Sequence, residues 1–154
     1  MAMGGLYYEE FSVGMRFDHV LRRTVTEADN LIFSSMTHNP AALHLDEEYM
    51  KGTEFGSRIV NSCFTLSLMV GVSVADTTLG TTIANLGWDQ VRFPRPVYPG
   101  DTLRTETIVH EMRTSRSRPE AGIVVFIHRC FNQRDEEVAV CKRTALMKRR
   151  VIPA

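Results

Sequence analysis

Residues 61–75, NSCFTLSLMVGVSVA, are the segment that most constrains the fold. Apolar side chains lie on almost every side of a helix drawn through this segment, which is typical of a helix buried inside a protein. The apolar run is too short to cross a bilayer, and it contains Thr, Ser and Gly. We therefore expect the rest of the chain to supply a layer that covers this helix.

The pattern changes after Thr78 to four runs rich in Val, Ile, Thr and aromatic residues: 81–93, 102–114, 122–133 and 136–149. Turn-forming stretches separate these runs, so the sequence predicts four strands. The last two runs predict a hairpin that turns at residues 133–136. Strands that follow one another after a buried helix indicate an α+β fold, an antiparallel sheet packed on the helix by one face.

The part of the chain before this helix predicts shorter elements. Residues 15–25 alternate loosely and predict a first strand. Thr26 and Asp29 form an acidic variant of the capping box, so a helix starts there and is expected to end at Asn39-Pro40. Residues 46–56 predict a second short helix. Because no repeat, low-complexity tract or linker is present, we expect a single domain over residues 1–154.

The composition excludes several classes of protein. Eighteen basic and 18 acidic residues give no net charge, so no whole-protein attraction to nucleic acid or to a membrane is expected. The N-terminal segment lacks the pattern of a signal peptide. Three cysteines without a CxxC motif suggest neither disulfides nor a metal site, and they predict a reducing, cytoplasmic location. The nucleotide-fold, serine-hydrolase and zinc-protease motifs are absent, and we expect no resident cofactor.

Two histidines in residues 36–50, MTHNPAALHLDEEYM, are candidates for a role in catalysis. His44 is either a turn or capping residue beside acidic neighbours, which the residue type alone favours, or a general base. An imidazole suits the second role because it exchanges protons near neutral pH. His38 lies at a predicted helix end, where a cation interacts favourably with the dipole. The other three histidines are expected to be structural or exposed: His19, His110 and His128.

Two asparagines lie where a carbonyl group could bind. Asn39 is either a turn residue or an amide that holds a water or a thioester. Asn61 and Ser62 open the apolar helix, with Asn61 as its N-cap. The N–H groups of about Ser62, Cys63 and Phe64 have no partner within the helix and could receive a carbonyl oxygen that becomes an oxyanion.

Arginines in two loops are candidates for binding an anion. Residues 91–103, VRFPRPVYPGDTL, contain Arg92, Phe93 and Arg95, and residues 115–122 contain Arg118. Each guanidinium is either solvated or available to a carboxylate or phosphate.

Three stretches in this order, NPAALHLD, FGSRIVNSCFTLSL and VRFPRPVYPGDTL, give the sequence its family resemblance. It resembles the MaoC-like dehydratases, the (R)-specific enoyl-CoA hydratase group of the hot-dog fold, from about residue 11 to 148. The resemblance implies a single hot-dog domain, with an antiparallel sheet wrapped around a buried central helix. It also implies a homodimer or higher homo-oligomer, a site at the interface, and reversible hydration of a 2-enoyl-CoA to a 3-hydroxyacyl-CoA. CoA would enter only as part of the substrate.

The resemblance also implies roles for individual residues. In the family motif Gly-Asp-x-Asn-Pro-hydrophobic-His, a catalytic Asp precedes a catalytic His. Alignment on the histidine makes His44 catalytic and puts Asn39 where the Asp is usual. An amide takes up no proton near neutral pH, but it can orient a water. Asn61 and Ser62 replace the usual His-Gly pair. The implied substrate-binding residues are Asn61, Ser62, Cys63, Phe64, Arg92, Phe93, Arg95 and Arg118.

The NPxxLH spacing and the TLGTTIANLGWDQVRFPRPV block are similar to a subgroup associated with branched C5 dicarboxylyl-CoA esters, of the itaconyl- or mesaconyl-CoA type. Arg92, Arg95 or Arg118 would then bind the free carboxylate. Two other functions remain open. One is a hot-dog acyl-CoA thioesterase. The other is a non-catalytic acyl-CoA-binding protein, which the Asn39 replacement favours.

Overall fold

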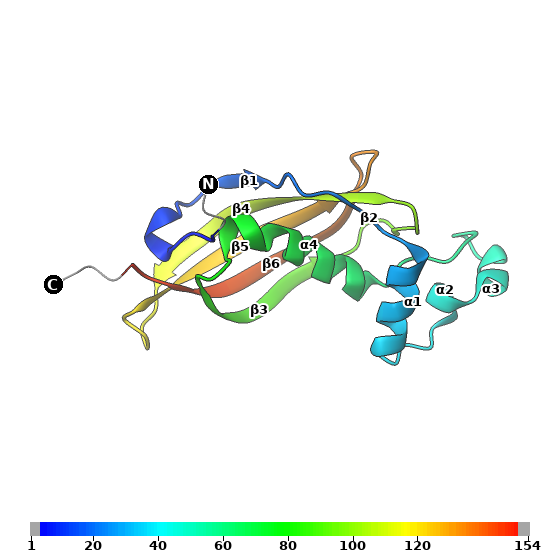
Figure 1. Cartoon of the computed structure of the whole chain (residues 1–154), viewed down its shortest axis with the longest axis horizontal. Helices are drawn as coiled ribbons and strands as arrows, with labels where there is room; N and C mark the ends of the chain where they lie inside the picture. The colour runs from blue at the N-terminus through cyan, green and yellow to red at the C-terminus, as the bar shows by residue number, and fades with distance from the viewer. Residues whose placement is uncertain (1–3, 151–154) are drawn as a thin grey trace.

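The computed structural model describes residues 4–150, and it contains an antiparallel sheet that curves around one long helix, α4 (Ser62–Thr77) (Figure 1). The four predicted strands are present, each within two residues of its expected bounds: β3 (Thr82–Arg92), β4 (Thr102–Thr114), β5 (Ala121–Phe131) and β6 (Glu137–Lys148). The strand order is β1-β4-β5-β6-β3, with β2 paired to β4. The predicted α+β arrangement is confirmed. The single domain over residues 1–154 stays a prediction, and its two ends lie outside the described residues.

Helix α4 has one face on the sheet and one face uncovered. Met69, Val72, Ser73 and Thr77 are buried. On the opposite side, Cys63, Ser67 and Gly71 are exposed. The expectation that the helix is buried all round is therefore wrong for one chain, because the sheet covers a single side of it. An apolar surface remains between α4 and the edge strand β3, lined by Cys63, Leu66, Ser67, Val70, Gly71 and Trp88.

The predicted first strand, residues 15–25, is divided in two. Strands β1 (Arg16–Asp18) and β2 (Arg23–Thr24) both pair with β4. The residues between them leave the sheet, because the side chain of His19 turns into the protein interior while Val20 and Leu21 are exposed.

Helix α1 (Glu27–Met36) begins as predicted but ends earlier. The Thr26 hydroxyl accepts the Asp29 N–H at 3.2 Å, and the Asp29 carboxylate accepts the Thr26 N–H at 2.8 Å. At the other end, His38 takes a left-handed backbone conformation with φ 54°. Its N–H and that of Asn39 donate to the carbonyls of Ser35 and Ser34. This is a Schellman ending, so backbone hydrogen bonds end the helix before the proline is reached.

The helix predicted over residues 46–56 is present as the shorter α3 (Glu47–Lys51), and a short helix that the sequence did not predict, α2 (Ala42–Leu45), precedes it. The break lies at Asp46, whose side chain accepts the Tyr49 N–H at 2.9 Å and caps α3. A cap residue has non-helical geometry, so the two helices cannot join there.

A chain of polar side chains runs from the C-terminal half of α4 through His19, which follows β1, to strands β4 and β5. Asp76 of α4 accepts a hydrogen bond from His19 Nδ1 at 2.7 Å, because a carboxylate only accepts. His19 Nε2 lies 2.8 Å from the Thr107 hydroxyl, which lies 2.8 Å from His128 Nδ1. His19, Thr107 and His128 are buried. The structural role expected of His19 and His128 stays a prediction that fits their burial, and His110 is exposed.

A separate pair of polar side chains lies on the next two strands, toward the edge of the sheet. Arg143 of β6 is buried and donates from Nε to the Asn85 side chain of β3 at 2.7 Å. No carboxylate of the described residues forms an ion pair with it. Two buried atoms, His128 Nε2 and Arg143 Nη1, have no hydrogen-bond partner among these residues. Burial, together with the charges of Arg143 and His19, lowers the pKa of His128 to about 3.

Candidate functional site

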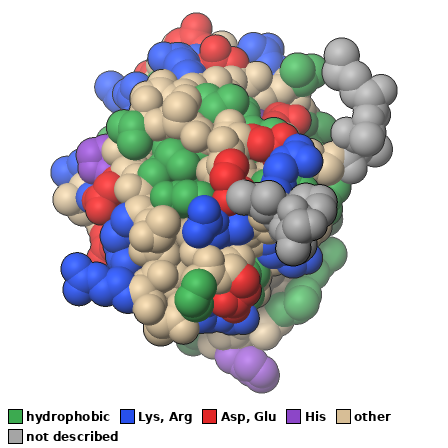
Figure 2. All heavy atoms as spheres, turned by 90° about the vertical axis from the view of Figure 1, so that its left-hand side faces the viewer, with side chains coloured by type: hydrophobic (Ala, Val, Ile, Leu, Met, Phe, Trp, Pro, Cys, Tyr) green, Lys and Arg blue, Asp and Glu red, His purple; other side chains and the backbone are tan. Residues whose placement is uncertain are grey.

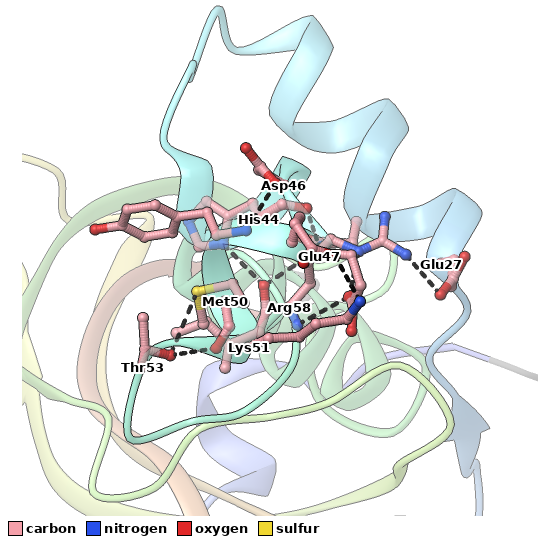
Figure 3. A network of polar contacts seen from close by, with 12 residues as sticks. Glu27, His44, Asp46, Glu47, Met50, Lys51, Thr53 and Arg58 are labelled. Atoms are coloured by element: carbon pink, nitrogen blue, oxygen red, sulfur yellow. Dashed lines mark hydrogen bonds and ion pairs between the residues drawn. The ribbon is translucent and has the colours of Figure 1, made fainter.

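One ring nitrogen of His44 forms a hydrogen bond, and the other has no partner among the described residues. His44 lies on α2 with 8% of its surface exposed, and its Nδ1 lies 2.8 Å from the carbonyl oxygen of Ile59 (Figure 3). A carbonyl oxygen can only accept, so Nδ1 carries the proton and Nε2 carries a lone pair when the ring is neutral. Nε2 has no hydrogen-bond partner among the described residues. This arrangement suits a general base.

The acidic residues that follow His44 have other partners. Asp46 caps α3. Glu47 and Glu27 both accept hydrogen bonds from the Arg58 guanidinium at 2.8 Å, which ties α1 and α3 to the segment before α4 (Figure 3). The orientation of His44 is therefore set by the Ile59 backbone rather than by these acids.

The N-terminus of α4 has two free backbone donors. Asn61 is the N-cap, as predicted, and its side-chain oxygen accepts the Cys63 N–H at 3.0 Å. The Thr65 N–H donates to the Asn61 carbonyl. The N–H groups of Ser62 and Phe64 have no acceptor in the described part of the chain. The cap thus occupies one of the three predicted donors, and the helix dipole favours negative charge at the other two.

A cavity of about 330 Å³ opens beside this helix end. Its walls are mostly apolar, and Arg95 is the charged residue among those that line it. Ile59, whose carbonyl orients His44, also lines it, whereas His44 itself is not among the lining residues. The lining residues are Phe55, Ile59, Val60, Ser62, Thr65, Phe93, Pro94, Arg95, Pro96, Val97 and Val138.

The structure brings Ser62, Phe93 and Arg95 of the predicted site together in this cavity. Arg95 is 54% exposed, and its nearest carboxylate oxygen, on Glu136, is 3.8 Å away. This guanidinium is therefore only weakly paired and can accept a further anion.

Other predicted residues are not among those that line the cavity. Asn39 is half-buried before α2, and its side-chain oxygen accepts the Ala41 N–H at 3.0 Å in an Asx turn. Phe64 packs its ring against Phe33, with centroids 5.7 Å apart. Arg92 is exposed at the end of β3.

Arg118 lies far from the other predicted site residues within one chain. It belongs to the β4–β5 turn, at the end of the molecule opposite α1, α2 and α3 (Figure 1). Helix α4 separates the two ends, and its 16 residues span about 24 Å. Arg118 pairs with Glu120 at 2.9 Å, and Arg149 and Arg150 pair with Glu9 and Glu10. Figure 2 shows this end, where basic and acidic side chains lie interspersed.

Sequence reasoning missed one residue that links the parts of this site. Asn30 of α1 is buried, with 1% of its surface exposed. Its amide bonds to the backbone of His44, Ile59 and Asn61. Asparagine is a poor helix former, so its place among apolar residues inside a helix was the only signal in the sequence.

Among residues 4–150, no cluster of three or more His, Cys, Asp or Glu side chains could hold a metal ion. Over the same range, no helix has the length and apolar character needed to cross a membrane.

Comparison with known proteins gives one family match and several relatives. The family model described as "MaoC like domain" matches residues 10–127. Mesaconyl-CoA hydratase of Cereibacter sphaeroides is 28% identical over 95% of this chain and 42% of its own length. Beta-methylmalyl-CoA dehydratase of Chloroflexus aurantiacus is 31% identical over 95% of this chain and 41% of its own length. The chain thus spans less than half the length of these two relatives.

Solved structures agree on the fold. The MaoC-like dehydratase from Rhodospirillum rubrum superposes with a TM-score of 0.84 at 30% identity, covering 96% of this chain and 100% of that chain. A Mycobacterium tuberculosis protein described as having a double hot-dog fold gives a TM-score of 0.86 at 23% identity, covering all of this chain and 48% of that one. The predicted hot-dog fold is confirmed.

Proposed function

The chain belongs to the MaoC-like dehydratase family, and we propose that it catalyses reversible hydration of a 2-enoyl-CoA to a 3-hydroxyacyl-CoA. The observation that carries the proposal is the hydrogen bond from His44 Nδ1 to the carbonyl of Ile59, a residue that lines an apolar cavity. This bond leaves Nε2 of His44 as a base. The names of the relatives, a hydratase and a dehydratase of CoA esters, support the same reaction.

In the proposed reaction, His44 Nε2 takes a proton from water as the water oxygen adds to C3 of the substrate. The C2=C3 electron pair moves toward the thioester, and the enolate oxygen binds the N–H groups of Ser62 and Phe64. One such donor is typically worth roughly 3–4 kcal/mol in the transition state. The enolate then takes a proton at C2. One water is added, and the thioester bond stays intact.

Asn39 would orient the attacking water. Its side-chain oxygen keeps one lone pair after bonding to Ala41, and its Nδ2 has no partner among the described residues. It takes no proton itself, so base catalysis falls to His44.

For the substrate, we propose a branched C5 dicarboxylyl-CoA of the mesaconyl or itaconyl type. The apolar cavity would take the short acyl group, and Arg95, which is weakly paired at the cavity, would bind its free carboxylate. The similarity to a mesaconyl-CoA hydratase supports this class. Arg118 would not serve this carboxylate within the same chain, because it lies beyond the opposite end of α4.

We also propose a homodimer. Beside the uncovered face of α4, the edge strand β3 presents exposed Leu86, Trp88 and Val91, and exposed Phe93 follows it. An unpaired edge strand is a template for pairing with a second copy. This chain matches 48% of a protein with a double hot-dog fold. Two copies of the chain, paired as a dimer, would therefore form the same double hot-dog arrangement. The cytoplasmic location inferred from the cysteines stays a prediction.

Purified protein offered crotonyl-, mesaconyl- and itaconyl-CoA tests the reaction by mass spectrometry, with a thiol reagent in parallel. Hydration gives a product heavier by one water and no free thiol. The control is His44→Asn, whose amide can still donate to Ile59 but offers no base. Release of CoA would replace the proposal with a thioesterase, and binding without turnover would replace it with an acyl-CoA-binding protein.

A further inference from the structure

We infer that Asn30 is the positioning residue that holds His44 and the N-terminus of α4 in register, an inference that rests on the proposed function. Its side chain lies between the two parts of the site, which belong to separate segments of the chain. Three hydrogen bonds, all to backbone atoms, connect it to them.

One side of the Asn30 amide holds the base. Its Nδ2 donates to the carbonyl of His44 at 3.1 Å and to the carbonyl of Ile59 at 3.2 Å. The Ile59 oxygen is the same atom that accepts the His44 ring proton at 2.8 Å. Asn30 therefore fixes both the backbone that carries the imidazole and the acceptor that sets its tautomer.

The other side of the amide holds the proposed oxyanion site. Asn30 Oδ1 accepts the N–H of Asn61 at 2.9 Å. Asn61 is the N-cap of α4, and the free N–H groups belong to Ser62 and Phe64 in the first turn that follows it. A single rigid amide thus sets the separation between the base and the helix end.

The chemistry of this position requires an amide. It must donate two hydrogens and accept one, which Asn does and which neither Asp nor Leu can do. Asp has nearly the same shape and can still accept from Asn61, but its carboxylate would repel the two carbonyl oxygens. Asn30→Asp therefore removes the two donated hydrogen bonds and leaves the packing of the side chain nearly unchanged.

The separation between His44 and the N-terminus of α4 should affect the chemical step more than it affects substrate binding. Among the residues that line the cavity, Asn30 bonds only to the backbone carbonyl of Ile59 and makes no hydrogen bond to Arg95, so ground-state binding should largely survive its replacement. A small misplacement of catalytic groups can cost about 100-fold in rate. We expect Asn30→Asp to lower kcat by about 10- to 100-fold while KM changes by less than about threefold.

The control for lost stability is Thr77→Ala. Thr77 is buried at the far end of α4, and its hydroxyl bonds to the Ser73 carbonyl. It contacts no part of the site. Its replacement should lower the melting temperature and leave kcat of the folded enzyme unchanged.

The test pairs these kinetics with the tautomer of His44, read from ¹⁵N chemical shifts of labelled histidines. The His44 signal is identified by its loss in His44→Asn. The wild type should show a protonated Nδ1, and Asn30→Asp should show mixed tautomers together with the fall in kcat. An unchanged tautomer with an unchanged kcat would overturn the inference. A changed tautomer in a protein whose wild type hydrates no enoyl-CoA would support the positioning role and refute the proposed function.

Discussion

The buried His128 should make the protein unstable in mild acid. Its pKa is lowered to about 3, mainly because burial disfavours the charged ring. In the unfolded chain an imidazole has a pKa of about 6.5. Between these two values the unfolded state binds a proton that the folded state does not, so stability is full above pH 6.5 and falls as the pH is lowered toward 3.

The size of the effect follows from the pKa difference. Each pH unit below 6.5 costs about 1.4 kcal/mol, so at pH 4.5 roughly 3 kcal/mol of unfolding free energy is lost through His128 alone. A typical protein has only about 5–15 kcal/mol in total. The buried Arg143, which adds positive charge near the ring, strengthens the effect.

Urea unfolding of wild type and His128→Asn at pH 7.0, 6.0, 5.0 and 4.5 measures this loss, at one fixed protein concentration. Asn keeps an N–H group that can donate to Thr107 but cannot titrate. The variant should be less stable at pH 7 and should lose less stability on acidification. The control, His110→Asn on the exposed part of β4, should keep the wild-type slope. Parallel wild-type and His128→Asn curves would refute the reasoning.

Four further outcomes are expected. His44→Asn should lower kcat by about 10²–10⁴-fold with an unchanged circular dichroism spectrum, because it removes only the base. Asn39→Asp restores a carboxylate where the family usually has one, and should keep or raise turnover of crotonyl-CoA. Arg95→Gln should reduce kcat/KM for mesaconyl-CoA by at least about tenfold more than for crotonyl-CoA, since only the former offers a carboxylate. Trp88→Glu should give a monomer in light scattering if β3 forms the dimer contact.

The sequence predicted best those elements whose pattern is local. The α4 helix and the four long strands were placed within two residues, because hydrophobic period and turn residues define them without reference to the rest of the chain. The capping box of Thr26 and Asp29 was also read correctly. The split of residues 15–25 was missed, because it depends on where the His19 side chain goes.

The site was predicted only in part. His44 and the N-cap Asn61 follow from motif position, but Asn30 owes its importance to three backbone groups that come together only in the folded chain. Cys63 was predicted to bind substrate, but the fold gives its N–H another partner. Its N–H is a free donor by position in the helix, yet the Asn61 side chain already occupies it.

The replacement of the usual Asp by Asn39 has a stereochemical consequence. With one base in the proposed site, His44 must both take the proton from water and return a proton to C2. A single side chain held by Ile59 reaches only one face of the double bond, so hydrogen and hydroxyl should enter from the same face. Hydration of mesaconyl- or crotonyl-CoA in D₂O, followed by NMR of the product, reports this directly. Deuterium on the face opposite the hydroxyl would require a second acid, and would show that a group other than His44 delivers the proton to C2.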